Sequence, residues 1–278
     1  MATRKHAPAR ATRTAPAKAA RPRRPATDDP GRYYGALSAQ GIRSVFTTLA
    51  GFINPRTELA YGSTYQLLVA VVLSAQSTDR GVNAATTHLF AVAPTPAAMV
   101  ALGVEAVSPY LRGINYYKTK ARNVVALSQQ LLDSHHGEVP EDRAALMALP
   151  GVGQKTASVV LNTAFRHPVI AVDTHIHRVA NRLGIATTTT PEQTEAVLMA
   201  RTPQAFLLDA HHYLILHGRY CCLARGPECW RCPVAKVCRY PDKTPASTAT
   251  ANRAPRGRHM HRTSTPSDAA PEHGPTSA

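Results

Sequence analysis

The chain has 278 residues and carries 32 Lys and Arg against 17 Asp and Glu, a formal net charge of +15 with a pI of ≈ 10.1. This length suits one large or two smaller domains, and a hydrophobic fraction of 44% excludes disorder throughout. The longest aliphatic run, Leu67–Leu73, is far shorter than the roughly 20 residues that span a bilayer, so we expect no membrane span. A basic protein of this kind most often binds a polyanion, and nucleic acid is the first candidate.

Most of this charge lies at the two ends of the chain. Residues 1–32 carry nine Lys or Arg and two acids, a net charge of +7, and residues 243–278 carry five and two, a net charge of +3. Both segments are poor in large apolar residues, so we expect disordered basic tails around a folded part with a net charge of +5. The Arg-rich first segment resembles an organelle transit peptide, but its prolines interrupt the amphipathic helix that such a peptide needs, and it lacks the apolar stretch of a secretory signal.

Between these tails, apolar residues recur at helical intervals. The spacing predicts helices over 67–72, 124–131 and 176–183. Two further helix starts are indicated by Thr95-Pro96 and Thr190-Pro191, each with a capping hydroxyl before a proline at the first helical position. We find no convincing alternating strand and no repeat of fixed period, so the predicted fold class is all-α.

A glycine turn follows in the segment LPGVGQKTA at residues 149–157. A helix before it must end at Pro150, and Gly151 and Gly153 suit a tight turn with positive φ before a second helix that begins near Gln154. Backbone N–H groups at such a helix N-terminus can bind a DNA phosphate without reading sequence. An ordinary helix–turn–helix corner would have the same pattern, so the turn alone leaves both interpretations open.

Lys155 lies in the first turn of that second helix, where the helix dipole disfavours a cation. The same field, with partial burial in a cleft, is expected to lower its pKa from about 10.4, which would make it a nucleophile able to form a Schiff base. Eighteen residues later, Asp173 stands where an apolar run meets an amphipathic helix. Its carboxylate could cap that helix, accept the lysine proton, or stabilise positive charge on a sugar ring.

All five cysteines of the chain lie between residues 221 and 238. A disulfide framework would spread its cysteines through the chain, and a protein of this size needs no disulfides for stability. Four thiolates in one short basic loop therefore indicate a bound metal and a reducing compartment. The spacing C-x6-C-x2-C-x5-C contains only one close pair, which favours an iron–sulfur cluster and leaves zinc as the alternative. The four residues in this pattern are Cys222, Cys229, Cys232 and Cys238, with Cys221 left over.

Together these features resemble the endonuclease III family, the bacterial bifunctional DNA glycosylase/AP lyases of the helix–hairpin–helix superfamily. The resemblance covers about residues 36–240. It rests on LPGVGQKTA with its lysine, on VDTHIHRVANRL, on ILHGRYCC at 215–222, and on the four-cysteine spacing.

This resemblance implies two helical domains flanking a DNA cleft. A six-helix barrel that ends with the helix–hairpin–helix would span 57–167. An iron–sulfur domain would combine 33–56 with 168–242, and the disordered tails would be 1–32 and 243–278.

The resemblance also implies the reaction. The enzyme would flip a damaged pyrimidine out of the duplex, because the sugar carbon is unreachable within the stack. Lys155 would attack C1′, displace the base and form a Schiff base, and β-elimination would cut the strand 3′ to the lesion. Asp173 would assist the lysine, and Cys222, Cys229, Cys232 and Cys238 would hold a [4Fe–4S] cluster and leave Cys221 free.

The residues expected at the DNA interface are scattered along the chain. Gln76 matches the side chain that fills the gap left by the flipped nucleotide, and Tyr116 stands where relatives carry a leucine wedge; an aromatic ring could still intercalate. Arg225 is the only base in the loop between the first two cysteines. The hairpin would hold a DNA phosphate, and a monovalent cation bound at the hairpin is a further candidate for mediating this contact. The full set is Gln76, Tyr116, Leu149, Gly151, Val152, Gly153 and Arg225.

The expected partner is double-stranded DNA with damaged pyrimidines or abasic sites, bound by a monomer in the bacterial cytoplasm at the nucleoid. A monofunctional adenine glycosylase shares the cysteine spacing, but it lacks the catalytic lysine and has an extra C-terminal domain. A non-catalytic DNA-structure binder would not need Lys155 with Asp173, and a ferredoxin-type electron carrier would not need a large basic helical body.

Overall fold

The structure is a computed structural model that describes residues 35–246, and the part of the chain it describes contains helices and no strand. The all-α prediction is therefore confirmed. The predicted tails at 1–32 and 243–278 lie outside the described residues, except for residues 243–246. The helices are α1 (Ala39–Ala50), α2 (Thr64–Ser74), α3 (Asp79–Val92), α4 (Pro96–Val107), α5 (Tyr117–His135), α6 (Arg143–Ala148), α7 (Gln154–Phe165), α8 (Thr174–Leu183), α9 (Pro191–Arg201), α10 (Gln204–Leu207) and α11 (Ala210–Tyr220), with 3-10 turns η1 (Ser108–Leu111) and η2 (Cys229–Arg231).

Most of the longer helices begin at a residue whose side-chain oxygen accepts a hydrogen bond from an amide of the first turn. Such a contact pairs one of the N–H groups that a helix start otherwise leaves without a partner. Both predicted Thr-Pro starts are confirmed, at α4 and α9. The capping residues are Ser38, Ser63, Thr78, Thr95, Asp142, Asp173 and Thr190.

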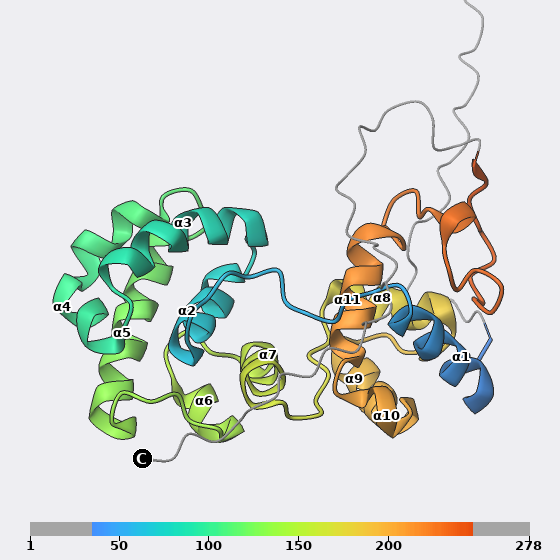
Figure 1. The fold of residues 1–278 in the computed structure, drawn as a ribbon, viewed down its shortest axis with the longest axis horizontal. Coiled ribbons are helices and arrows are strands. Elements are labelled where there is room, and N and C mark those ends of the chain that lie inside the picture. The colour runs from blue at the N-terminus through green and yellow to red at the C-terminus, as the bar shows by residue number, and fades with distance from the viewer. Residues whose placement is uncertain (1–34, 247–278) are drawn as a thin grey trace, which may run out of the picture.

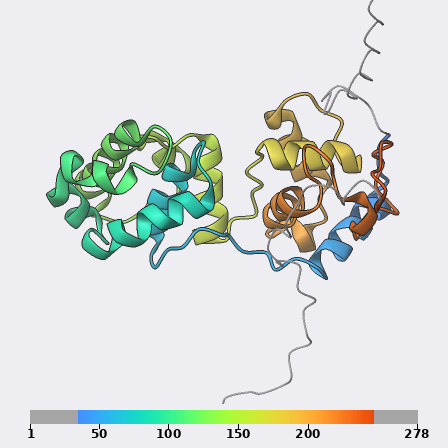
Figure 2. The ribbon, with the colours of Figure 1, turned by 90° about the horizontal axis from the view of Figure 1, so that it is seen from above.

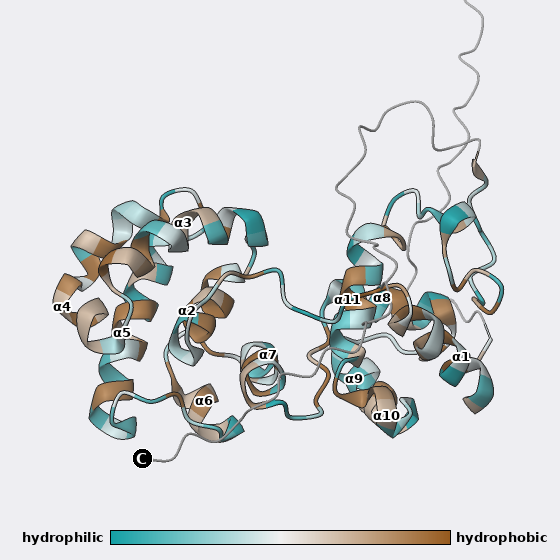
Figure 3. Ribbon diagram, viewed as in Figure 1, coloured by the Kyte–Doolittle hydropathy of each residue, from teal (hydrophilic) through white to brown (hydrophobic). Residues whose placement is uncertain are grey.

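The helices gather in two lobes (Figure 1). The barrel lobe contains α2 to α7, arranged around α2, which is brown over most of its length in Figure 3. Residues 67–73 of α2 are all buried, so this helix is apolar on every side rather than amphipathic, as expected at the centre of a helical core. The core cluster of this lobe runs from Leu59 to Leu161, with the partly buried Val169 packed against it.

The cysteine lobe contains α1 and α8 to α11 and buries a second apolar cluster, drawn from residues 37–53 and 170–234. Helix α11 packs against both α8 and α1, which joins the two distant parts of the chain. Figure 2 shows the chain passing between the lobes twice, once after α1 and once after α7. The predicted boundaries at residues 57 and 168 lie close to the ends of these clusters, and the division into two domains at these residues stays a prediction.

Helix α4 contains a bend at Gly103, whose φ of +74° is unfavourable for residues with a side chain. Within residues 35–246, no single helix is long and apolar enough to cross a membrane. One pair, Asp79–Val92 with Pro96–Leu111, reaches the required length and composition, but its two parts are bent by 112°.

Candidate active site

Helices α6 and α7 form the predicted hairpin around residues 149–153. The amide of Val152 donates to the carbonyl of Leu149 at 3.1 Å, which closes the turn. Gly151 has a φ of +80°, and a Cβ added there would lie 2.9 Å from Nδ2 of Asn123 on α5. The prediction of a positive φ is wrong for Gly153, whose φ is −98° and which serves as the N-cap of α7. Only Gly151 therefore needs to be glycine on conformational grounds.

The two apolar residues of the turn face inward. Leu149 and Val152 are 2% and 7% exposed and belong to the core of the barrel lobe. Gly151 and Gly153, in contrast, are exposed. The hairpin thus offers backbone groups, rather than the side chains of Leu149 and Val152, to a ligand.

Lys155 and Asp173 meet where the two lobes join. The lysine is the second residue of α7, and its Nζ lies 3.7 Å from Oδ2 of Asp173. The Lys155 side chain is 54% exposed, so a substrate can reach the amino group, whereas the Asp173 side chain is only 12% exposed. The predicted pairing of these two residues is present in the structure.

Asp173 uses its two carboxylate oxygens for different contacts. Oδ1 accepts from the amides of His175 and Ile176, both at 2.9 Å, and so caps α8. Oδ2 is the oxygen that faces Lys155. Burial disfavours the charged carboxylate, but the charge of Lys155 and the Ile176 amide outweigh it and hold the pKa of Asp173 below its ordinary value. The group is therefore an anion at neutral pH.

A pocket that is open to solvent lies between the lobes, and Lys155 is part of its wall. The segment before α2 and helices α2, α3, α7 and α11 supply the lining. Two histidines of α11, His211 and His212, line it and are 4% and 5% exposed. Burial lowers the pKa of His211 to about 3 and that of His212 to about 4, so both rings are neutral at physiological pH.

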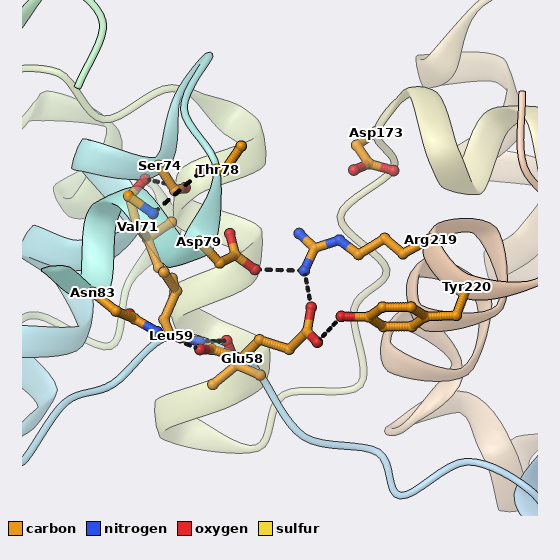
Figure 4. A network of polar contacts seen from close by, with 12 residues as sticks. Glu58, Leu59, Val71, Ser74, Thr78, Asp79, Asn83, Asp173, Arg219 and Tyr220 are labelled. Carbon is orange, nitrogen blue, oxygen red and sulfur yellow. Dashed lines mark hydrogen bonds and ion pairs between the residues drawn. The ribbon is translucent and has the colours of Figure 1, made fainter. Parts of the chain in front are cut away.

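A charged network crosses the pocket from one lobe to the other (Figure 4). Nη1 of Arg219, in the last turn of α11, donates to Oε2 of Glu58 at 2.5 Å and also to Oδ2 of Asp79 on α3. The hydroxyl of Tyr220 donates to the other oxygen of Glu58. Burial works against the guanidinium charge, but Asp79 and Glu58 outweigh it and raise the pKa of Arg219.

Gln76 lies next to the loop that carries Asn115 and Tyr116, although Gln76 and Asn115 are 39 residues apart in the sequence. The side-chain amide of Asn115 donates to the carbonyl of Gln76 at 2.6 Å. Gln76 and Tyr116 both have positive φ, 54° and 57°, a strained conformation for residues with a side chain. Tyr116 is 67% exposed, so its ring is available to a partner. The structure thus brings together the two residues predicted to act at the flipped nucleotide.

A buried lysine holds the segment around Gln76 in place. Lys120 on α5 is 6% exposed, and its Nζ donates to the carbonyls of Leu73 and Ala75 at 2.9 and 2.6 Å and to Oγ of Ser77 at 2.9 Å. Burial lowers the pKa of Lys120. Its three contacts flank Gln76 on both sides, so this lysine determines the path of the segment.

The five cysteines line one cavity in the cysteine lobe. Cys221, the residue predicted to be left over, is 1% exposed and lies beside Cys232. Their sulfur atoms and a ring nitrogen of His217 lie within 4.8 Å of one another. Arg225 is exposed in the loop between the first two predicted cluster ligands.

The surroundings of this cavity suit an anionic metal–thiolate group. Arg182 is 2% exposed, and its Nη1 lies 3.7 Å from Sγ of Cys222. The same guanidinium donates to the carbonyls of Leu223 and Ala224 at 2.7 and 3.1 Å. A buried cation beside one thiol of a cavity lined by cysteines offsets the negative charge that a cysteine-ligated cluster brings.

Sequence reasoning missed Glu58, Asp79, Arg219 and Lys120, as well as the two pocket histidines. Arg219 lies inside the ILHGRYCC stretch, but this motif by itself assigns no partner and no role to the arginine. The three partners of the network come from positions 58, 79 and 219, and no local spacing relates them. Lys120 looks like an ordinary helical surface lysine until its burial is known.

The comparisons with known proteins agree with this geometry. The family described as "HhH-GPD superfamily base excision DNA repair protein" matches residues 69–204. Endonuclease III of Escherichia coli (strain K12) is 55% identical over 190 residues, which cover 68% of this chain and 90% of the relative. Endonuclease III of Treponema pallidum (strain Nichols) is 50% identical over 203 residues, which cover 73% of this chain and 96% of the relative.

Solved structures give the same result. A trapped endonuclease III–DNA covalent intermediate is 43% identical, with a TM-score of 0.69, and the match covers 73% of this chain and 96% of that one. A non-covalent endonuclease III–DNA complex matches with the same identity, TM-score and coverage. With relatives of this identity matched over nearly their whole length, the chain belongs to the endonuclease III family of helix–hairpin–helix DNA glycosylases/AP lyases that act in base-excision repair.

Proposed function

We propose that the chain removes oxidised pyrimidines from duplex DNA and then cleaves the strand 3′ to the abasic site, with Lys155 as the nucleophile. The observation that carries this proposal is the position of Lys155. Its half-exposed amino group lies 3.7 Å from the buried carboxylate of Asp173, on the wall of the pocket between the lobes. A base that is flipped out of the duplex needs such a pocket next to the group that attacks its sugar.

In the proposed reaction, Lys155 first loses a proton to Oδ2 of Asp173. The lone pair of Nζ then attacks C1′ of the extruded nucleotide, and the electron pair of the glycosidic bond leaves with the base, which takes up that proton. The C1′–O4′ bond then breaks as one proton of Nζ passes to O4′, which turns the new Nζ–C1′ bond into a protonated Schiff base. A water molecule accepts a proton from C2′, the electron pair of that C–H bond forms the C2′–C3′ double bond, and the C3′–O bond breaks, so the 3′ phosphate leaves by β-elimination.

Asp173 has two tasks in this scheme. Its amide contacts hold Oδ1 in place, so the proton from Lys155 goes to Oδ2. Its lowered pKa keeps it anionic before the attack, and an anion at this position stabilises positive charge that develops on the sugar.

The DNA contacts follow from the exposed elements around the pocket. The backbone of Gly151 and Gly153 would hold a DNA phosphate at the start of α7, and a monovalent cation bound there would be a further mediator of this contact. Gln76 would fill the space of the extruded nucleotide, and Tyr116 would wedge into the stack from the neighbouring loop. Arg225 would contact a phosphate from the cysteine lobe, and one copy of the chain suffices for all these contacts.

We further propose a [4Fe–4S] cluster held by Cys222, Cys229, Cys232 and Cys238. These residues fit the group because they share one cavity beside the buried cation of Arg182. When bound, the cluster supplies a covalent cross-link between the end of α11 and the segment that follows it, and no step of the reaction at Lys155 needs it.

Borohydride trapping tests the proposed nucleophile. Wild-type protein is incubated with duplexes that contain either an abasic site or thymine glycol, and the Schiff base is reduced to a stable adduct. We expect an adduct and strand cleavage with both duplexes, and neither with Lys155→Ala, which should still bind DNA. Lys118→Ala, an exposed lysine of α5, is the control that should behave as wild type. A trapped adduct in Lys155→Ala would place the nucleophile elsewhere, and no adduct with the wild type would remove the lyase step.

A further inference from the structure

The Arg219 network is more than a link between the lobes, because the arginine uses only one edge of its guanidinium for it. Both carboxylates, Glu58 and Asp79, are bonded through the same nitrogen, Nη1. Among residues 35–246, Nη2 and Nε of Arg219 have no hydrogen-bond partner, and Figure 4 shows both dashed contacts to the carboxylates meeting at one nitrogen of the guanidinium. The side chain is 27% exposed and lines the same pocket as Lys155.

The composition of the pocket wall indicates what those donors bind. The residues that line it, within the described part of the chain, include no Phe, Tyr or Trp on which a flat base could stack. Its α11 side presents two neutral histidines and a fixed cation. A pyrimidine that has lost its 5,6 double bond is puckered and stacks poorly, but it keeps its ring carbonyls as hydrogen-bond acceptors. Such a base suits this wall better than an intact aromatic base.

We propose that Arg219 determines base specificity: its free guanidinium edge donates hydrogen bonds to a ring carbonyl of an extruded 5,6-saturated pyrimidine. This inference rests on the proposed function, because a nucleotide attacked by Lys155 at C1′ places its base in this pocket. Glu58 and Asp79 hold the guanidinium in one orientation, so little side-chain freedom is lost when the base binds. Arg219 touches the base and not the reacting sugar atoms, which makes it a specificity residue.

Arg219→Lys separates this role from the link between the lobes. A lysine ammonium can still lie between the two carboxylates, but it lacks the second edge that faces the base. We expect single-turnover release of dihydrouracil or thymine glycol to fall about 10- to 100-fold, the effect of losing a hydrogen bond from a charged donor. Cleavage of an abasic duplex should stay within about twofold of wild type, because that substrate has no base to bind.

Arg166→Lys is the matched control, since it makes the same substitution in an arginine that pairs with a carboxylate, Asp209, outside the pocket. It should leave both rates near wild type. Arg219→Gln is the second variant in case Arg219→Lys does not fold, and it should show the same split between the two rates.

The outcomes are distinct. If base release and abasic-site cleavage fall together in a folded Arg219 variant, the residue only joins the lobes, and the inference is wrong. Unchanged release of both saturated bases would overturn it as well. If the wild type itself leaves the abasic duplex uncut, the proposed function fails, whatever the Arg219 variants do.

Discussion

Asp173 both caps the first helix after the barrel lobe and pairs with Lys155 of the preceding helix, Oδ1 serving the cap and Oδ2 facing the amine. One side chain therefore sets the position of α8 relative to Lys155. Mutations at Asp173 that remove both contacts cannot separate folding from chemistry. An isosteric amide can, because asparagine is also a good N-cap.

Asp173→Asn should keep α8 capped and remove the negative charge beside Lys155. We expect base release and Schiff-base formation to slow by about 10²- to 10³-fold, as for the loss of an electrostatic contact to the reacting centre, with little change in melting temperature. Single-turnover rates and thermal unfolding measure the two effects. Asp142→Asn, at the equivalent cap of α6, is the control; a rate loss of similar size there would show that the effect is structural.

Gly151→Ala should damage the hairpin, because the new Cβ would lie 2.9 Å from Asn123 in a backbone with φ +80°. The strain is of order 1–3 kcal/mol, and we expect weaker DNA binding from the displaced turn. Gly153→Ala is the matched control, since its φ is negative and no heavy atom lies within 4 Å of its Cβ position. Affinity for an abasic-analogue duplex and denaturant unfolding provide the readouts. Equal losses in the two variants would contradict the assigned geometry.

Lys120→Met should destabilise the loop that carries Gln76. It removes the donor for the carbonyls of Leu73 and Ala75 and for the Ser77 hydroxyl, and unpaired buried acceptors of this kind cost about 3 kcal/mol together. Denaturant unfolding measures the loss, and hydrogen exchange locates it near residues 73–77. The neighbouring exposed lysine gives the control, Lys118→Met, which should change stability by less than about 0.5 kcal/mol. Full protection of this segment in Lys120→Met would refute the prediction.

The buried histidines should make the folded state acid-sensitive. Their pKa values fall from 6.5 to about 3 for His211 and about 4 for His212. Between these limits the unfolded chain binds protons that the folded chain does not, so stability decreases as the pH falls from about 6.5, by up to about 1.4 kcal/mol per pH unit for each ring. Unfolding curves from pH 7 to pH 5 measure the slope.

His212→Gln should flatten this pH dependence, whereas His88→Gln, at an exposed position of α3, should leave it unchanged. Any acid loss of a bound cluster would affect the two variants alike. An identical slope in both would show that buried His212 does not contribute.

The cysteine assignment predicts a visible phenotype. The purified protein should be brown, and Cys229→Ser should remove most of the broad visible absorption, since it deletes a cluster ligand. Cys221→Ser should keep the colour, even though Cys221 lines the same cavity beside Cys232. Absorption spectra and iron content of anaerobic preparations check this. A colourless wild type that contains zinc, or loss of colour in Cys221→Ser, would require a different ligand set.

Much of the site could be predicted because its chemistry is encoded in short segments. Lys155 follows directly from a glycine turn, Asp173 from the start of the next helix, and the cysteines from one loop. The turn geometry was predicted only in part, because a two-glycine pattern does not say which glycine has positive φ. Likewise, the pattern could not show that Leu149 faces the core.

The sequence alone determined the all-α class and indicated helix caps, the candidate nucleophile and the candidate cluster ligands, because each depends on residues that are neighbours along the chain. The tertiary structure decided which distant residues share a surface. It brought Glu58, Asp79 and Arg219 together across the pocket, and it buried Lys120 beneath the Gln76 loop. These contacts arise from the packing of α2, α3, α5 and α11, and packing depends on the shapes of whole helices, which no local spacing records.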